Sequence, residues 1–345
     1  MIPYQGSKQN IVKTLVNVMH DTTPCKSDFC DLFGGGGAVA NYVNNFKKFN
    51  LFEDFEFKNV YYNELSTVFY AFEWLQKNDV NSILPPSEWV SRERFNEAKL
   101  YNFNIKNDYL RAKNALIKCC FSFANNQKDY LYAKEIEEFK YAVHLFNFSE
   151  YSDDVVSEIA LKIENNTFFF NEIPHKAIVN RDKIADFMLK IIKGKRRFFL
   201  NKCLKIEGVN LQKRNEKNAI NQLENTARIE NTEQIQQKNN TDKLIKCSKK
   251  DAFEILKNPK NYVENPENTI FYADPPYIDT KGYGDDFDFK TFKALCIEFK
   301  HTLYISEYTN YFPFKTLKSI EKRQLACKEV RSNVVNELLI WNHIN

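Results

Sequence analysis

The residues whose types best suit a chemical role are four consecutive ones, Asp274-Pro275-Pro276-Tyr277. A carboxylate and a neighbouring carbonyl oxygen can both accept hydrogen bonds from one amino group, which localises the nitrogen lone pair as the amine attacks. The two prolines restrict φ and stiffen the segment, and the tyrosine ring could stack on a planar substrate. The pattern indicates chemistry on an exocyclic amine of an aromatic ring. The plainer alternative is a Pro-Pro turn with Asp274 as a turn former.

Elements around this segment decide between the two interpretations. Residues 269–273, Thr-Ile-Phe-Tyr-Ala, predict a strand that ends at Asp274. Ligands of open α/β sheets bind beyond the carboxyl ends of the strands, so this position favours the chemical role.

A glycine cluster marks a second candidate site. Residues 34–37 hold four of the 9 glycines of the chain, between a strand predicted at 29–33 and a helix predicted at 38–46. Such a loop allows close approach of backbone to a ligand, and the helix N–H groups favour an anionic group such as a methionine carboxylate. The spacing is not that of a dinucleotide-binding loop. A tight turn is the alternative.

The remaining pattern predicts a parallel α/β sheet. A strand at 60–65 carries Glu64 near its end and precedes a helix at 67–76, and a helix is expected at 11–19. Glu64 could accept hydrogen bonds from both hydroxyls of a ribose, or could simply cap a helix. The last part of the chain predicts strands at 302–306 and 335–341 and a helix at 289–299.

The middle of the chain interrupts this pattern. We expect a catalytic domain formed by 1–77 and 247–345, an insertion at 78–214, and a polar linker or exposed excursion at 215–246. Lysine and arginine are concentrated at 193–214, which suits contacts with a phosphate backbone as well as a solvated helix face.

Composition narrows the class of protein. The 345 residues carry a formal charge of +4, which by itself does not indicate a nucleic-acid binder. The 8 cysteines lack the paired spacing of zinc or redox sites, so we expect reduced thiols and no metal. No apolar run reaches the length of a membrane span, and we expect a cytoplasmic protein with no membrane contact.

The ordered motifs resemble the Dam-like (D12 class) DNA adenine-N6 methyltransferases. The resemblance implies a Rossmann-like class I methyltransferase sheet with an inserted, mainly helical target recognition domain, and S-adenosyl-L-methionine as cofactor. It implies catalysis by Asp274, Pro275, Pro276 and Tyr277 on a base flipped out of double-stranded DNA. The cofactor-binding residues that it implies are Tyr4, Gln5, Gly6, Lys8, Asp31, Phe33, Gly34, Gly35, Gly36, Glu64, Asp251 and Asp274.

Within the chain, DNA contacts are expected mainly in the insertion. The candidates are Asn125, Asn126, Gln127, Lys128, Arg196 and Arg197, with Tyr308 from the catalytic domain. The segment 121–130 is equally typical of an aromatic core strand with a polar turn.

Three alternatives stay open at this point. Cytosine N4 and RNA adenine also present an amine to such a loop, and a relative that binds DNA without catalysis would keep the same fold. We expect a monomer, and a restriction endonuclease partner is compatible with the sequence. The recognition sequence is not encoded in a readable form.

Overall fold

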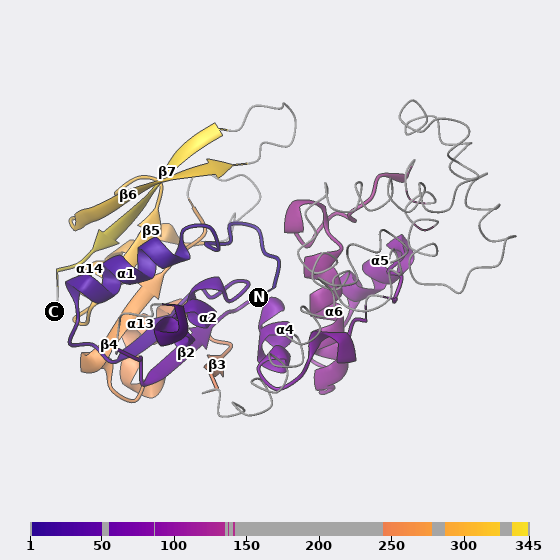
Figure 1. The fold of residues 1–345 in the computed structure, drawn as a ribbon, viewed down its shortest axis with the longest axis horizontal. Helices are drawn as coiled ribbons and strands as arrows, with labels where there is room; N and C mark the ends of the chain where they lie inside the picture. Colours follow the sequence, from indigo (N-terminus) through magenta and orange to yellow (C-terminus); the bar gives the residue numbers. More distant parts are fainter. Residues whose placement is uncertain are drawn as a thin grey trace, which may run out of the picture. The chain divides into compact units, whose positions relative to one another are not determined.

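The computed structural model describes residues 2–49, 55–85, 87–134, 137, 141, 244–277, 287–324 and 333–343. The chain divides into two compact units (Figure 1), formed by Met1–Lys77, Ile105–Ala115 and Leu244–Asn345, and by Asn78–Asn104 and Leu116–Lys243. Residues 105–115 thus belong to the first unit, although the sequence pattern placed them in the insertion. The basic run at 193–214, with Arg196 and Arg197, lies outside the described residues, as does the polar segment up to 243.

The first unit is built on one seven-stranded sheet within the described residues, in the order β3-β2-β1-β4-β5-β7-β6. The strands are β1 (Asp28–Asp31), β2 (Asn59–Asn63), β3 (Lys246–Ser248), β4 (Thr269–Ala273), β5 (Leu303–Glu307), β6 (Lys315–Gln324) and β7 (Asn333–Trp341). Neighbours from β3 to β5 are parallel, whereas β7 runs antiparallel to both β5 and β6. The mostly parallel α/β fold is therefore confirmed, and it is compatible with a Rossmann-like fold.

Central strands could be predicted because both of their faces are buried. Every residue of β1 and β4 is buried, as is expected when helices cover both faces of a parallel sheet. The sequence pattern missed two strands at the edges of the sheet. β3 has 3 residues, too few to show a period, and β6 is rich in lysine, a composition that protects an edge strand but hides it among loops.

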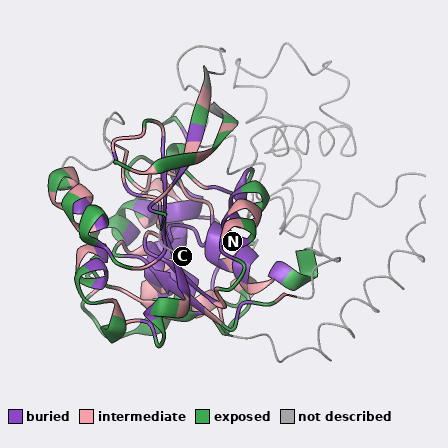
Figure 2. Ribbon diagram, turned by 90° about the vertical axis from the view of Figure 1, so that its left-hand side faces the viewer, coloured by how far each residue is buried: buried purple, intermediate pink, exposed green. Residues whose placement is uncertain are grey.

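Helices pack on both faces of the sheet. On one face Phe29 and Tyr62 form ring contacts with Phe57 and with Phe72 of α4 (Val68–Leu75). On the other face, Cys30 and Phe271 share a core with α13 (Ala252–Lys257) and α14 (Phe289–Glu298). Figure 2 shows the buried centre of the sheet between helices with exposed outer surfaces.

Other helices frame the beginning of the chain. Three helices precede β2: α1 (Val12–Thr22), α2 (Ala38–Asn44) and the short α3 (Phe46–Phe49). Later in the chain, between α13 and β4, 3-10 turns lie at Pro259–Asn261 and Pro266–Asn268. Asp251 is the N-cap of α13, because its carboxylate accepts a hydrogen bond from Phe253 N–H at 2.9 Å. Lys246, the last residue of the segment expected as a linker, is the first residue of β3.

The described part of the second unit is helical. It holds α5 (Arg92–Leu100), the end of α6 (Asp108–Cys120) and 3-10 turns at Val80–Ser82 and Phe123–Asn125. Buried Phe95 lies against Tyr130, with ring centroids 5.6 Å apart. Across the described residues, the helices are too short or too polar to cross a lipid bilayer.

Glycine positions yield a prediction that separates backbone strain from steric overlap. Gly6 and Gly37 both have positive φ, of 82° and 76°. A Cβ at Gly6 would meet no heavy atom within 4 Å, whereas one at Gly37 would overlap the Phe72 ring. Gly6→Ala should cost about 1–2 kcal/mol of unfolding free energy from left-handed strain alone.

Gly37→Ala should cost about 1–3 kcal/mol more than Gly6→Ala, because the core must also move. Urea unfolding of both variants measures the difference. Equal losses in the two variants would contradict the packing of Phe72 on the loop.

Candidate functional site

Three carboxylates gather where adjacent strands end. Asp31 closes β1, Glu64 follows β2 and Asp274 follows β4, and these strands are neighbours in the order β2-β1-β4. Burial raises the pKa of Asp31 well above its ordinary value, and the charges of Asp274 and Glu64 raise it further. The carboxyl edge of the sheet therefore concentrates negative charge at the place where α/β folds bind ligands.

Asp31 is the most constrained of these acids. Its residue is 1% exposed, and Oδ1 has no hydrogen-bond partner among the residues that the structure describes. Hydrogen bonds from the backbone of Phe33 and Ala40 partly offset the rise of its pKa. A buried carboxylate oxygen without a hydrogen-bond donor is stabilised by a nearby cation or by protonation of the carboxylate.

Glu64 connects the end of β2 to the glycine loop. Its Oε2 accepts a hydrogen bond from Gly35 N–H at 2.8 Å, and its Oε1 accepts one from Ser66 N–H at 2.7 Å. Each carboxylate oxygen can accept a second hydrogen bond. Glu64 thus orders the loop and still has acceptor capacity for ligand hydroxyls.

The glycines of the loop are required first by the protein's own packing. A Cβ at Gly34 would overlap the ring of Tyr62, and one at Gly36 would overlap the carbonyl oxygen of Ile2. The ring of Tyr4 lies 2.9 Å from the Cβ position of Gly35, and the hydroxyl of Tyr62 donates to the Gly35 carbonyl at 2.7 Å. The sequence analysis explained these glycines by the close approach of a ligand. The packing of the protein itself is sufficient to explain them.

Asp274 lies in a network that ties distant segments together. The Lys8 ammonium is 2.7 Å from Asp274 Oδ1 and 3.1 Å from Glu337 Oε1. The Tyr277 hydroxyl is 3.0 Å from Asp274 Oδ1 and 2.6 Å from Glu337 Oε1. Lys8, expected beside the cofactor, thus pairs with the residue expected to catalyse.

Two acids of this network were not among the expected site residues. Glu337 on β7 is 0% exposed and Glu307 at the end of β5 is 1% exposed. The pKa of Glu307 is raised to about 7, chiefly by burial and then by Asp274 and Glu337. The available signal was an acid inside an otherwise apolar strand, Val-Val-Asn-Glu-Leu-Leu-Ile-Trp, because acids are rarely fully buried without a partner.

Two tyrosines form an aromatic pair beside Asp274. The rings of Tyr277 and Tyr308 have centroids 4.3 Å apart at an interplanar angle of 52°. The Lys8 ammonium lies 4.9 Å from the centre of the Tyr277 ring. Tyr308, expected to contact DNA, is thereby placed next to the Asp-Pro-Pro-Tyr segment.

Other expected cofactor residues lie elsewhere. Phe33 packs against Phe287 and Phe292, with centroids 5.9 and 5.7 Å away. Gln5 and Gly6 are exposed, and so is Asp251 at the start of α13. Among the described residues, the side chains of Gln5 and Asp251 make no hydrogen bond or ion pair with the three acids at the sheet edge.

The expected DNA-contact loop of the second unit is internally braced. Asn126 Oδ1 accepts hydrogen bonds from the N–H groups of Lys128 and Asp129, at 2.9 and 3.0 Å. Asn125 and Gln127 have positive φ, and a bridge joins Ser122 to Tyr130. The segment is a polar turn between buried aromatics, with Lys128 exposed at its tip.

A scan of the chain against protein-family models gave no match. A search of curated proteins likewise found no relative. Among the described residues, no group of three or more His, Cys, Asp or Glu side chains is arranged to hold a metal ion.

The buried acid Glu307 gives a prediction about pH. Because its pKa is about 7 in the fold against an ordinary 4.5, the folded protein binds more protons than the unfolded chain between these values. Stability should therefore fall as pH rises through this window and level off above it. Glu307→Gln should remove this loss, so its melting temperature relative to the parent should be higher at pH 8 than at pH 4.5, a difference that differential scanning calorimetry measures.

Proposed function

We propose that this chain transfers a methyl group from S-adenosyl-L-methionine to the N6 amine of adenine in DNA, on a base flipped out of the duplex. The observation that carries the proposal is the position of the Asp-Pro-Pro-Tyr segment. Asp274 follows the central parallel strand β4, next to Asp31 and Glu64 at the ends of β1 and β2. The resemblance of the ordered motifs to Dam-like enzymes specifies adenine N6.

The sheet supports this proposal at the level of fold. The mostly parallel sheet, in the order β3-β2-β1-β4-β5-β7-β6 with β7 antiparallel to β5 and β6, is compatible with the Rossmann-like methyltransferase sheet that the resemblance implies. Because one fold can host many functions, the sheet supports the proposal only by analogy. The proposed methyl transfer rests on the residues of the site.

The acids at the sheet edge fit the proposed cofactor. S-Adenosyl-L-methionine carries an ammonium and a sulfonium against one carboxylate, and is therefore a net cation. Asp31, with a buried oxygen that lacks a partner among the described residues, would hold the methionine ammonium. Glu64 would accept hydrogen bonds from the ribose hydroxyls through its second lone pairs, and the Tyr4 side chain lies against Gly35 and Gly36 of the glycine loop.

The chemistry assigned to this chain is positioning and proton acceptance. When bound, the cofactor supplies an electrophilic methyl group. Asp274 and the Pro275 carbonyl would accept hydrogen bonds from the two amine hydrogens, and so localise the lone pair that would form the new N–C bond as the methyl–sulfur bond breaks and its electron pair stays on the sulfur as a thioether. One N–H proton then leaves to Asp274. Tyr277 and Tyr308 offer aromatic faces for the flipped base.

Asp274→Asn should abolish the chemical step. The amide cannot accept the amine proton, so methyl transfer should fall by about 10²–10⁴-fold. The measurement is incorporation of labelled methyl groups into duplex DNA, followed by digestion with nucleases sensitive to adenine methylation. The matched control is Asp288→Asn, at the exposed cap of α14, where asparagine preserves the cap.

Near-normal transfer by Asp274→Asn would refute the catalytic assignment. Parallel assays on single-stranded DNA, structured RNA and cytosine-only sites decide between adenine N6 in DNA and the other amines. DNA binding without transfer to any of these substrates would instead favour a non-catalytic relative.

Asp31→Asn should separate stability from cofactor binding. Loss of a buried charge should leave the ligand-free protein as stable as the parent or more stable, since burial already raises the pKa of Asp31. Loss of a charged hydrogen bond worth about 1.5–3 kcal/mol should weaken cofactor binding about 10- to 100-fold.

Isothermal titration calorimetry measures this affinity. The control is Asp28→Asn at the opposite end of the same strand, where the carboxylate accepts from Asn59 Nδ2 at 3.0 Å. Asp28→Asn should leave cofactor affinity unchanged. Equal affinities in all three proteins would exclude Asp31 from the cofactor site.

A further inference from the structure

The Lys8 ammonium is shared between two acids. Its side chain is 3% exposed, and it lies 2.7 Å from Asp274 and 3.1 Å from Glu337. Burial lowers the pKa of Lys8, but the two carboxylates outweigh burial and keep the pKa above its ordinary value, so the ammonium is charged. Asp274 is 20% exposed at its side chain, whereas Glu337 is fully enclosed.

This sharing matters for the reaction assigned to Asp274. If the Lys8 ammonium were paired with Asp274 alone, it would occupy the hydrogen-bond acceptors of the Asp274 carboxylate. It would also lower the affinity of that carboxylate for a proton. Glu337, which cannot reach solvent, attracts the same ammonium strongly, since an uncompensated buried charge is costly. The presence of Glu337 thus limits how much of the Lys8 charge Asp274 experiences.

The Tyr277 hydroxyl is shared in the same way. It lies 2.6 Å from Glu337 and 3.0 Å from Asp274, and it has one proton to donate. The shorter distance favours donation to Glu337. The same interaction fixes the Tyr277 ring against Tyr308, at a centroid distance of 4.3 Å.

We propose that Glu337 is a positioning residue that draws Lys8 and the Tyr277 hydroxyl toward itself, and thereby preserves the acceptor strength of Asp274 for the substrate amine. The inference rests on the proposed function for its substrate. Glu337 itself acts through Lys8 and Tyr277 and has no assigned contact with the reacting atoms.

The charged surroundings of Asp274 set the direction of the expected effects. Those groups are Lys8 from the segment before α1, Tyr277 of its own loop, Tyr272 on β4, Glu307 on β5, Glu337 on β7 and Asp31 on β1. Lys8 is the one cation in this set. Removing Glu337 should therefore lower the pKa of Asp274, and removing Lys8 should raise it.

The test compares Glu337→Gln and Lys8→Met with the parent protein. The acid limb of kcat for methyl transfer to duplex DNA, at saturating cofactor, should move to lower pH in Glu337→Gln and to higher pH in Lys8→Met, by roughly one unit or more. In Glu337→Gln, kcat at neutral pH should fall at least about tenfold with little change in KM for the cofactor. A fall in kcat with an unmoved limb is the result of a purely structural role and would overturn the proposal.

A second readout does not require methyl transfer. Carboxyl ¹³C NMR titration, with the Asp274 signal assigned through Asp274→Asn, should show the same opposite shifts of its pKa. If the parent transfers no methyl group but these shifts appear, the proposed function fails and the positioning role stands. Shifts in one direction, or none, reject the positioning role whatever the substrate.

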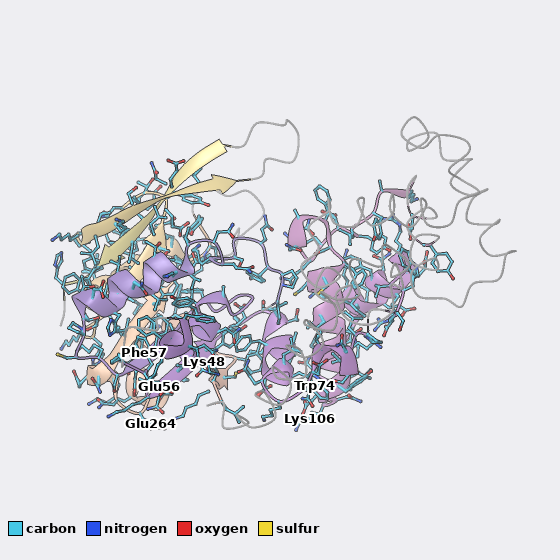
Figure 3. All side chains as sticks on the ribbon, viewed as in Figure 1. Lys48, Glu56, Phe57, Trp74, Lys106 and Glu264 are labelled. Atoms are coloured by element: carbon cyan, nitrogen blue, oxygen red, sulfur yellow. The ribbon has the colours of Figure 1, made fainter. Side chains whose placement is uncertain are left out.

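Two further variants control for folding and for loss of charge. Lys8→Met with Glu337→Gln removes both buried charges, so it is the folding control for Lys8→Met, which leaves two acids without their cation. The double variant should place the Asp274 pKa between those of the single variants. Glu264→Gln removes an exposed acid, labelled in Figure 3, from its ion pair with Lys246. It should leave the pH profile and the Asp274 titration unchanged, and a shift here equal to that of Glu337→Gln would contradict a local effect.

Discussion

The ion pairs of Lys8 connect three parts of the chain that are far apart in sequence. Lys8 precedes α1, Asp274 follows β4 and Glu337 lies within β7, and the ammonium lies within 3.1 Å of both carboxylates. Both acids would be hard to accommodate near each other without a cation, because like charges in a buried site repel. The arrangement of the Asp-Pro-Pro-Tyr segment therefore depends on where the N-terminal segment and β7 meet.

The glycine loop is a second constraint, and it is steric. Tyr62, Phe72 and Tyr4 occupy the space that side chains at the loop would need. Glu64 adds a hydrogen bond from its carboxylate to Gly35 N–H. The loop thus packs against side chains of β2, of α4 and of the N-terminal segment. Its position relative to Asp31 follows from this packing, and any ligand would bind to a preformed edge.

Charge is the property that connects the fold to the proposed chemistry. Acids from β1, β2, β4, β5 and β7 converge on one edge, and burial raises the pKa of Asp31 and of Glu307. A cationic ligand relieves such repulsion, and an anionic one would increase it. The proposed cofactor, with its sulfonium and ammonium, has the matching sign, which is why Asp31 is expected to contribute to binding at the expense of stability in the free protein.

The sequence by itself determined the central elements and the principal acids. The strands that carry Asp31, Glu64 and Asp274 are apolar runs bounded by turn residues, and local pattern suffices to place them. Only the tertiary structure placed Lys8 between Asp274 and Glu337 and enclosed Glu307. These contacts join residues up to 329 positions apart, as Lys8 and Glu337 are, and no local pattern specifies which distant charges meet. The antiparallel pairing of β5 with β7 determines which of these charges meet, because its register brings Glu337 beside the end of β5.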